Sequence, residues 1–198
     1  MGLDVEYING QTPLDEDEKD GLLIPTIATR GELNEFEQQN IEEAVQWTLT
    51  RNFKLETVFT QAFIRLLHQR MFSNVWAWAG EFRKTNKNIG IDKWQIATEL
   101  KCLLDDAYYW HTNNIYGHDE IAQRFKHRIV SIHCFPNGNG RHSRLMADII
   151  INKIFKKPVF SWGAGDLSSQ NDSREEYLKA LRMADKGDYS LLLSFARS

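Results

Sequence analysis

Residues 133–144 read His133-Cys134-Phe135-Pro136-Asn137-Gly138-Asn139-Gly140-Arg141-His142-Ser143-Arg144. Glycines on both sides of an amide residue can adopt backbone angles that are closed to other residues, so successive N–H groups can point into one concavity. Arg141 and Arg144 are three positions apart, so on a helix they would share one face and could bind the same anion. Histidine has an ordinary pKa of about 6.5, which suits His133 to the role of general base. The stretch therefore predicts a polyphosphate-binding loop beside a base, an arrangement suited to phosphoryl or nucleotidyl transfer to a hydroxyl.

Segments with helical spacing lie on both sides of this loop. The segment before it carries apolar residues at positions 121, 125, 129 and 132, and the segment after it is apolar from 145 to 154 on more than one side. The second pattern predicts a central helix. The same spacing predicts helices at about 33–48, 58–71, 96–107, 177–181 and 189–195. With no internal repeat, the chain is predicted to be one all-α domain, a helical bundle around a central helix–loop–helix motif.

The composition favours an ordinary globular protein. The chain has 198 residues, 42% of them hydrophobic and 26% charged, which is enough to bury a substantial core. A net charge of −3 gives no general attraction to nucleic acid, and no direct nucleic-acid binding is expected. Residues 1–6 lack a signal-peptide pattern and the sequence has no long apolar run, so no membrane association is expected. Cys102 and Cys134 form no metal-binding or disulfide pattern, which favours a reducing cytoplasm.

Two segments depart from the helical pattern. Residues 1–28 are predicted to be an N-terminal arm, in which the charged run 15–20 is solvated and Leu22-Leu23-Ile24 pack on the domain. Thr29 and Glu32 then have the spacing of a capping box, which predicts a helix start just after Thr29. Residues 84–91 have turn chemistry between short extended pieces, which predicts a β-hairpin with its tip near 86–88.

The motif resembles the signature of the Fic (filamentation induced by cyclic AMP) family, His-x-Phe-x-(Asp/Glu)-Gly-Asn-Gly-Arg-x-x-Arg. The chain departs from it only at Asn137, where the family has a carboxylate. The segments Trp76-Ala77-Trp78-Ala79-Gly80-Glu81-Phe82-Arg83 and Arg174-x-x-Tyr177-x-x-Ala180-Leu181 are also similar to Fic segments, in the same order. The resemblance implies a Fic fold over 29–198, with a flap at about 83–95 and the signature loop at 133–144. More narrowly, the chain resembles the bacterial group called mobile mystery protein B, which is found beside a helix-turn-helix partner.

The resemblance also implies a reaction and its residues. His133 would deprotonate a Ser, Thr or Tyr hydroxyl of a target protein, which would attack the α-phosphorus of ATP and take up AMP. The amides around Gly138, Asn139 and Gly140 would hold the α- and β-phosphates, while Arg141 and Arg144 would bind the β/γ end. The flap would align the unknown target protein by adding its backbone as an extra strand; the residues implied are Thr85, Asn86, Lys87, Asn88, Ile89 and Gly90.

Asn137 stands where the resemblance implies a Mg²⁺ ligand. Its neutral carbonyl oxygen is a weaker ligand than a carboxylate, so Mg²⁺ is expected to be held weakly and delivered by ATP. Three outcomes stay open. The protein is a slow but competent protein adenylyltransferase, an enzyme that transfers another phosphate-containing group such as UMP or phosphocholine, or a catalytically weak nucleotide-binding module that acts through a partner.

Many Fic proteins carry an inhibitory helix with the pattern Ser/Thr-x-x-x-Glu-(Gly/Asn), whose glutamate pairs with the second motif arginine, here Arg144. Thr12 and Glu16 give the only match in spacing, with Pro13 inside it and Asp17 after it. The sequence therefore predicts no intrinsic inhibitory helix of the usual form. A separate antitoxin-like protein could supply the inhibition.

The remaining candidate residues have structural alternatives. Phe135 is predicted to anchor the loop in the core, and Cys134 to be a small buried filler rather than a nucleophile. His142 could touch a phosphate or lie on the surface, and His127 lacks the spacing of a metal pair with His133. Surface or capping positions are expected for His68, His111 and His118, core packing for Trp76 and Trp78, and solvated turn positions for Lys84 and Lys87.

Overall fold

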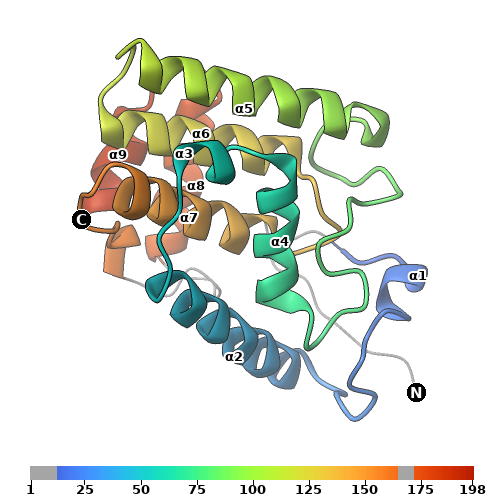
Figure 1. Ribbon diagram of the computed structural model, residues 1–198. Helices are drawn as coiled ribbons and strands as arrows, with labels where there is room; N and C mark the ends of the chain where they lie inside the picture. Colours follow the sequence, from blue (N-terminus) through green and yellow to red (C-terminus); the bar gives the residue numbers. More distant parts are fainter. Residues whose placement is uncertain (1–12, 165–171) are drawn as a thin grey trace.

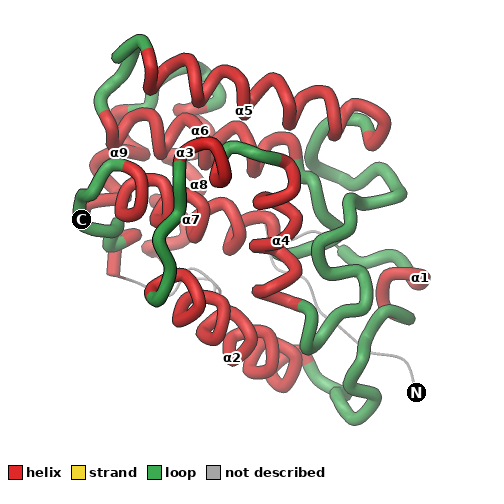
Figure 2. Tube along the Cα trace, viewed as in Figure 1, coloured by secondary structure: helices red, strands yellow, loops and turns green. Residues whose placement is uncertain are grey.

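The structure, a computed structural model, describes residues 13–164 and 172–198. Helices make up the regular secondary structure of these residues (Figures 1 and 2). The described ranges contain no β-strand, and a single isolated bridge joins Leu22 to Trp76. The predicted all-α class is therefore confirmed. No helix in the described ranges combines the length and the apolar character that crossing a membrane requires.

The α-helices follow the chain order predicted from apolar spacing, with two short additions. Their bounds are α1 Glu16–Lys19, α2 Arg30–Leu49, α3 Leu55–Val58, α4 Gln61–Phe72, α5 Ile96–Thr112, α6 His118–Ile132, α7 Asn139–Ile149, α8 Asp172–Ala184 and α9 Ser190–Arg197. A π-helical turn, Ile150–Ile154, extends α7, and short 3₁₀ turns lie at Lys93–Gln95 and Trp162–Ala164. The single helix predicted for 58–71 is instead α3 and α4, because Thr60 caps a new helix by accepting a hydrogen bond from the Phe63 amide.

The capping box predicted at Thr29 is confirmed. The Thr29 hydroxyl accepts a hydrogen bond from the Glu32 amide, and the Glu32 carboxylate accepts one from the Thr29 amide. These bonds satisfy amides that the first turn of a helix leaves unpaired. Helix α2 therefore begins at Arg30, and it packs along α4.

The helices that carry the 133–144 stretch lie in the middle of the bundle. Helices α5, α6 and α7 lie side by side, α4 crosses them at a steep angle, and α2 runs along the other end of α4 (Figure 1). The main core continues from α7 into its π-helical turn, where Ile150 and Ile151 are fully buried. Helices α8 and α9 pack on each other and form a second apolar cluster around Tyr177, Leu192 and Phe195. The loop between α6 and α7 is thus held between two helices of the main core.

The β-hairpin predicted within the flap at about 83–95 is wrong. The segment is an irregular loop that leads into the 3₁₀ turn Lys93–Gln95. A buried side chain replaces the cross-strand ladder, because Arg83 donates hydrogen bonds from its guanidinium to the carbonyls of Thr85 and Ile91. Carbonyls on both arms of the loop are satisfied in this way without strand pairing.

Residues 1–12 of the predicted arm lie outside the described residues. In the described part, the charged run 15–20 forms α1, and Leu14 and Ile27 are buried in the main core. Leu22 and Ile24 pack against the same core, whereas Leu23 is 51% exposed. The described part of the arm is therefore attached to the bundle at several points.

Candidate active site

The loop between α6 and α7 begins and ends with left-handed backbone. His133 ends α6 with φ 58° and ψ 60°, and Gly138 precedes α7 with φ 76°. A non-glycine residue in this region is uncommon and strained, so the surrounding structure must hold His133 in place. A Cβ added at Gly138 would lie 2.5 Å from the Phe72 ring, which explains glycine at this position.

The inside of the loop is fixed to the core. Phe135 and Cys134 are fully buried, in agreement with their predicted structural roles, and burial raises the pKa of the Cys134 thiol to about 12. The Asn139 side chain accepts from the Phe135 amide at 3.0 Å and donates to the Phe135 carbonyl at 2.8 Å. The Asn139 side chain therefore closes the loop, which leaves only the backbone of Asn139 to contact a ligand.

The first turn of α7 presents amides toward the pocket side of this loop. The amides of Asn139, Gly140 and Arg141 have no hydrogen-bond acceptor among the described residues, as expected for the start of a helix. The Gly138 amide instead donates to Asn137 Oδ1 at 2.6 Å. Free amides and the helix dipole favour a bound anion at this end of α7.

Two buried histidines support the loop, and sequence reasoning missed both. His68 is fully buried; its Nδ1 accepts a hydrogen bond from the Gly80 amide at 3.0 Å, so its Nε2 donates to the Asn137 carbonyl at 3.1 Å. His142 is also buried and donates from Nε2 to the Ile64 carbonyl at 3.0 Å. The surface or capping position predicted for His68 is wrong. His142 meets neither of its predicted alternatives, since it is buried and does not line the pocket. The spacing of His68 from Ile64 and Phe72 placed it on the apolar face of α4 and could have indicated this.

His133 is almost completely buried, with 4% of its surface exposed. Burial lowers its pKa to about 4, assisted by the positive charges of Arg83 and Lys87 and opposed by the Val130 carbonyl. The imidazole is therefore neutral near pH 7 and able to accept a proton.

One pocket contains His133, the start of α7 and the flap, with a volume of about 390 Å³. Its wall includes residues that sequence reasoning did not assign to a site, from α2 and α8. In α8, the lining residues Arg174, Tyr177 and Leu181 recur at helical spacing and so share one helix face. This spacing could have indicated that α8 contributes to the site. The lining residues are Arg30, Asn34, Ile89, Gly90, His127, Val130, Ser131, His133, Asn137, Gly138, Asn139, Gly140, Arg141, Arg144, Arg174, Tyr177, Leu178, Leu181 and Asp185.

The two motif arginines both line the pocket but differ in their partners. Arg141 forms an ion pair with the buried carboxylate of Glu37 in α2, with 2.7 Å between Nη1 and Oε2. Arg144 lies 5.8 Å from the centre of the Tyr177 ring, and no carboxylate of the described residues lies within ion-pair distance of it. Arg144 is therefore the motif arginine whose charge is least neutralised by the protein.

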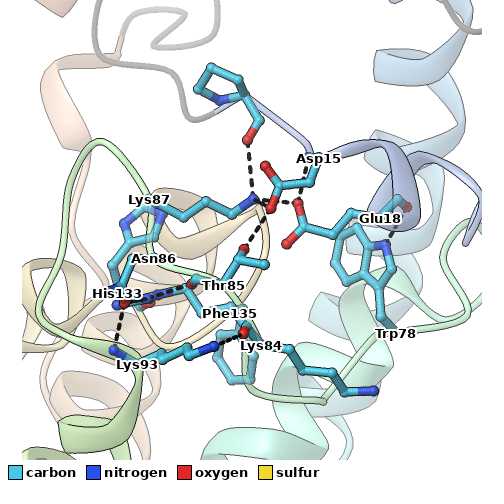
Figure 3. Close-up of polar contacts among 12 residues, drawn as sticks. Asp15, Glu18, Trp78, Lys84, Thr85, Asn86, Lys87, Lys93, His133 and Phe135 are labelled. Atoms are coloured by element: carbon cyan, nitrogen blue, oxygen red, sulfur yellow. Dashed lines mark hydrogen bonds and ion pairs between the residues drawn. The ribbon is translucent and has the colours of Figure 1, made fainter.

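The residues predicted to form the flap divide into two groups. Ile89 and Gly90 line the pocket, and a Cβ added at Gly90 would lie only 2.6 Å from His133 Cβ. Thr85 and Lys87 instead face the N-terminal arm (Figure 3). Thr85 donates to Asp15, Asn86 donates to Asp92, and Asn88 is exposed.

Lys87 was predicted to be a solvated turn residue, and that prediction is wrong. Its side chain is only 3% exposed, with Nζ 2.9 Å from Asp15 and 2.5 Å from Glu18 (Figure 3). Lys84, by contrast, has 86% of its side chain exposed, as predicted. Helix α1 therefore covers the outer side of the flap, while the inner side faces His133.

The predicted weak metal position at Asn137 offers little to a cation. Its Oδ1 already accepts the Gly138 amide, and no group of three or more His, Cys, Asp or Glu side chains suited to a metal occurs in the described ranges. His127 is likewise engaged with protein partners, Asp185 at 2.8 Å and the Tyr189 hydroxyl at 3.1 Å. The donor set does not fit a metal held by the protein alone.

Comparisons with known proteins agree with this fold and motif. The Fic/DOC family model matches residues 58–151. A Fido domain-containing protein of Dictyostelium discoideum is 39% identical over 67 residues, a match that covers 33% of this chain and 41% of that protein. The chain therefore spans less than half the length of that curated relative.

Solved structures share the fold. The BepC protein of Bartonella tribocorum, a VirB-translocated effector solved with bound AMPPNP, has a TM-score of 0.64 and 20% identity, covering 91% of this chain and 96% of that chain. Fic-1 of Caenorhabditis elegans has a TM-score of 0.64 and 21% identity, covering 89% of this chain and 50% of that chain. The helix–loop–helix site and the bundle around it define a Fic fold. Together with the family match, they identify residues 58–151 as a Fic/DOC domain within a chain that has the Fic fold.

Proposed function

We propose that the protein is a protein adenylyltransferase that moves AMP from ATP to a Ser, Thr or Tyr hydroxyl of a target protein. One observation carries the proposal: a neutral, buried histidine lies in the same pocket as the amides that begin α7 and as Arg144, which forms no ion pair among the described residues. A base and an anion site in one pocket can align a hydroxyl with a phosphorus atom. The AMPPNP in the BepC structure supports ATP as the donor class.

In the proposed reaction, one set of groups binds the phosphates and His133 accepts the proton. The amides of Asn139 and Gly140 and the guanidinium of Arg144 hold the phosphates and stabilise charge on the leaving group. The target hydroxyl gives its proton to His133, and we expect Nε2 to accept it because Nδ1 is buried. The hydroxyl oxygen forms a bond to the α-phosphorus, the bond from that phosphorus to the bridging oxygen breaks, and pyrophosphate leaves with the electron pair.

Mg²⁺ is a proposed companion of ATP rather than a group held by the protein. It would neutralise charge on the phosphates, as hard cations do in phosphoryl transfer. Asn137, with its Oδ1 bound to the Gly138 amide, provides a poor ligand, so the phosphates would supply most of the coordination.

The flap is the proposed docking edge for the target. None of the backbone amides from Thr85 to Asp92 has a hydrogen-bond acceptor among the described residues, so an extended segment of a target could pair with them. Ile89 and Gly90 would bring that segment beside His133, because both line the pocket.

Two observations favour a second candidate, a nucleotide-binding module with little transfer activity that acts through a partner. Asn137 replaces a carboxylate, and Glu37 neutralises Arg141 in the absence of ligand. The Asn137 side chain would bind a metal ion weakly, and the ion pair reduces the positive charge that Arg141 offers. Both features leave less positive charge to stabilise a leaving group. A separate antitoxin-like or helix-turn-helix partner remains a prediction.

Transfer of radiolabel separates the candidates. Incubation of the protein with cell extract, Mg²⁺ and ATP labelled at the α-phosphate should add label beyond that of the extract alone, and ATP labelled at the γ-phosphate should add none. His133→Ala should abolish the label. Asn137→Asp should raise the rate roughly tenfold and lower the Mg²⁺ required, because a carboxylate is a stronger ligand.

The mass added to the labelled protein identifies the donor, since AMP, UMP and phosphocholine differ in mass. Label that survives His133→Ala would remove the proposed base. If both the wild type and Asn137→Asp bind ATP tightly but transfer no label, the adenylyltransferase proposal is refuted and the nucleotide-binding module is the better description.

A further inference from the structure

Arg83 connects the flap to the catalytic loop through one buried side chain. It is 3% exposed, and its guanidinium donates from Nε to the His133 carbonyl at 2.7 Å and from Nη1 to the Thr85 carbonyl at 2.8 Å. Its Nη2 donates to the Ile91 carbonyl, and its own amide donates to the Cys134 carbonyl at 3.0 Å. A single planar group therefore joins both arms of the flap to the residue that begins the signature loop.

The geometry at His133 requires such a support. His133 is a non-glycine residue with left-handed backbone, a conformation that persists only when neighbouring contacts enforce it. The bond from Arg83 Nε acts on the carbonyl of this strained residue. Gly90 also packs closely against His133, and Arg83 reaches the adjacent Ile91.

We propose that Arg83 is a positioning residue, whose fork of hydrogen bonds sets the flap and His133 in one arrangement. The planar fork is essential because three carbonyls in different directions are bound at once. An ammonium group would keep the charge but could not hold all three in the same way.

The charge has a separate consequence from the fork. Among the described residues, the groups that act on the His133 imidazole include the guanidinium of Arg83 and the ammonium of Lys87 from the flap, and the Val130 carbonyl from α6. The positive charge of Arg83 disfavours imidazolium, so its removal should raise the pKa of His133 from about 4 toward its ordinary value. Replacement of Arg83 by lysine should leave that pKa low.

Two variants separate these effects in the protein without nucleotide. In Arg83→Lys, backbone order parameters of residues 85–91, measured by ¹⁵N relaxation, should fall from roughly 0.85 to below about 0.6, with the His133 pKa near the wild-type value. In Arg83→Gln, the order parameters should fall and the His133 pKa should also rise, as measured by carbon-13 NMR of labelled histidine. The His133 signal is assigned from its loss in His133→Ala.

Arg65→Lys is the matched control. Arg65 donates from Nε to the Gly80 carbonyl at 2.8 Å and lies 5.5 Å from the centre of the Phe82 ring. Gly80 and Phe82 come directly before the flap in the sequence. No hydrogen bond of Arg65 reaches the described residues of the flap or His133. Both readouts should be unchanged in this variant. If Arg83→Gln does not fold by circular dichroism, Arg83→Lys with the control decides the question.

An ordered flap in Arg83→Lys, or equal loosening in Arg65→Lys, would overturn the positioning role of the fork. An unchanged His133 pKa in folded Arg83→Gln would overturn the role of the charge. The importance of this arrangement for catalysis rests on the proposed function, but neither readout needs nucleotide or target. Absence of transfer in the wild type would therefore refute the proposed function and leave the inference on Arg83 to its own test.

Discussion

Glu37 in α2 and Arg141 in the first turn of α7 form an ion pair. The Glu37 side chain is 3% exposed, and its other oxygen accepts a hydrogen bond from Trp76 Nε1 at 2.7 Å. A phosphate that approaches Arg141 must therefore share this guanidinium with a buried carboxylate. Glu37 thus pairs with Arg141, the first arginine of the motif. The glutamate of the usual Fic inhibitory helix would instead pair with the second arginine, here Arg144.

Glu37→Gln should tighten nucleotide binding. The substitution removes the negative charge that is paired with Arg141 and leaves the charge of Arg141 to the ligand, so we expect roughly threefold higher affinity, about 0.7 kcal/mol. Isothermal titration with a non-hydrolysable ATP analogue measures the change. Weaker binding would mean that Glu37 serves mainly to orient Arg141.

His68→Phe should destabilise the fold strongly. The ring remains, but the Gly80 amide and the Asn137 carbonyl lose their partner, at about 1–3 kcal/mol for each buried group left unpaired. Urea unfolding measures the loss. His111→Phe is the control, because His111 is only partly buried and its ring contacts are with His118 and Phe155. Equal losses in the two variants would contradict the role given to the His68 bonds.

Stability should fall as the pH is lowered from about 6.5 toward 4. Burial lowers the pKa of His142 and of His133 to about 4, so the unfolded chain takes up protons in this range before the folded protein does. Each of these histidines should remove roughly 3 kcal/mol over the interval. Stability that they contribute is fully present above the unfolded pKa of about 6.5.

Urea unfolding at pH 7 and pH 5 measures this slope. His142→Gln should flatten it, because the glutamine amide can still donate to the Ile64 carbonyl but does not titrate. A slope unchanged by the substitution would show that other groups carry the pH dependence.

Lys87→Met should release the flap from the N-terminal arm. Its buried ammonium pairs with Asp15 and Glu18, so the change leaves two carboxylates without that partner, and we expect a loss of about 1–3 kcal/mol. Lys84→Met is the matched control, since that side chain is 86% exposed and lies 3.6 Å from Glu81. Equal stability of the two variants in urea unfolding would refute the structural role of Lys87.

The parts predicted correctly from the sequence depend on local chemistry. The start of α2 follows from Thr29 and Glu32, which satisfy each other within one turn, and the helical segments follow from apolar spacing. The burial of Phe135 follows from an aromatic residue inside a polar loop. The resemblance of residues 133–144 to the Fic signature led directly to the family and its fold.

The parts that sequence reasoning missed depend on contacts between distant residues. Lys87 is buried only because Asp15 and Glu18 lie against it, and the flap lacks strands because Arg83 binds the carbonyls that strands would pair. Glu37 reaches Arg141 from a helix more than a hundred positions away. Charge and turn composition alone favour solvated lysines and hairpins in such segments, so the tertiary partners decided the outcome.

A crystal structure of the protein with α,β-methylene ATP tests the central proposal most directly. We predict phosphates on the amides of Asn139 and Gly140 and on Arg144, with the α-phosphorus beside the His133 imidazole and Ile89 and Gly90 still forming one wall. A nucleotide bound elsewhere, or an α-phosphorus turned away from an imidazole sealed behind the flap, would contradict it.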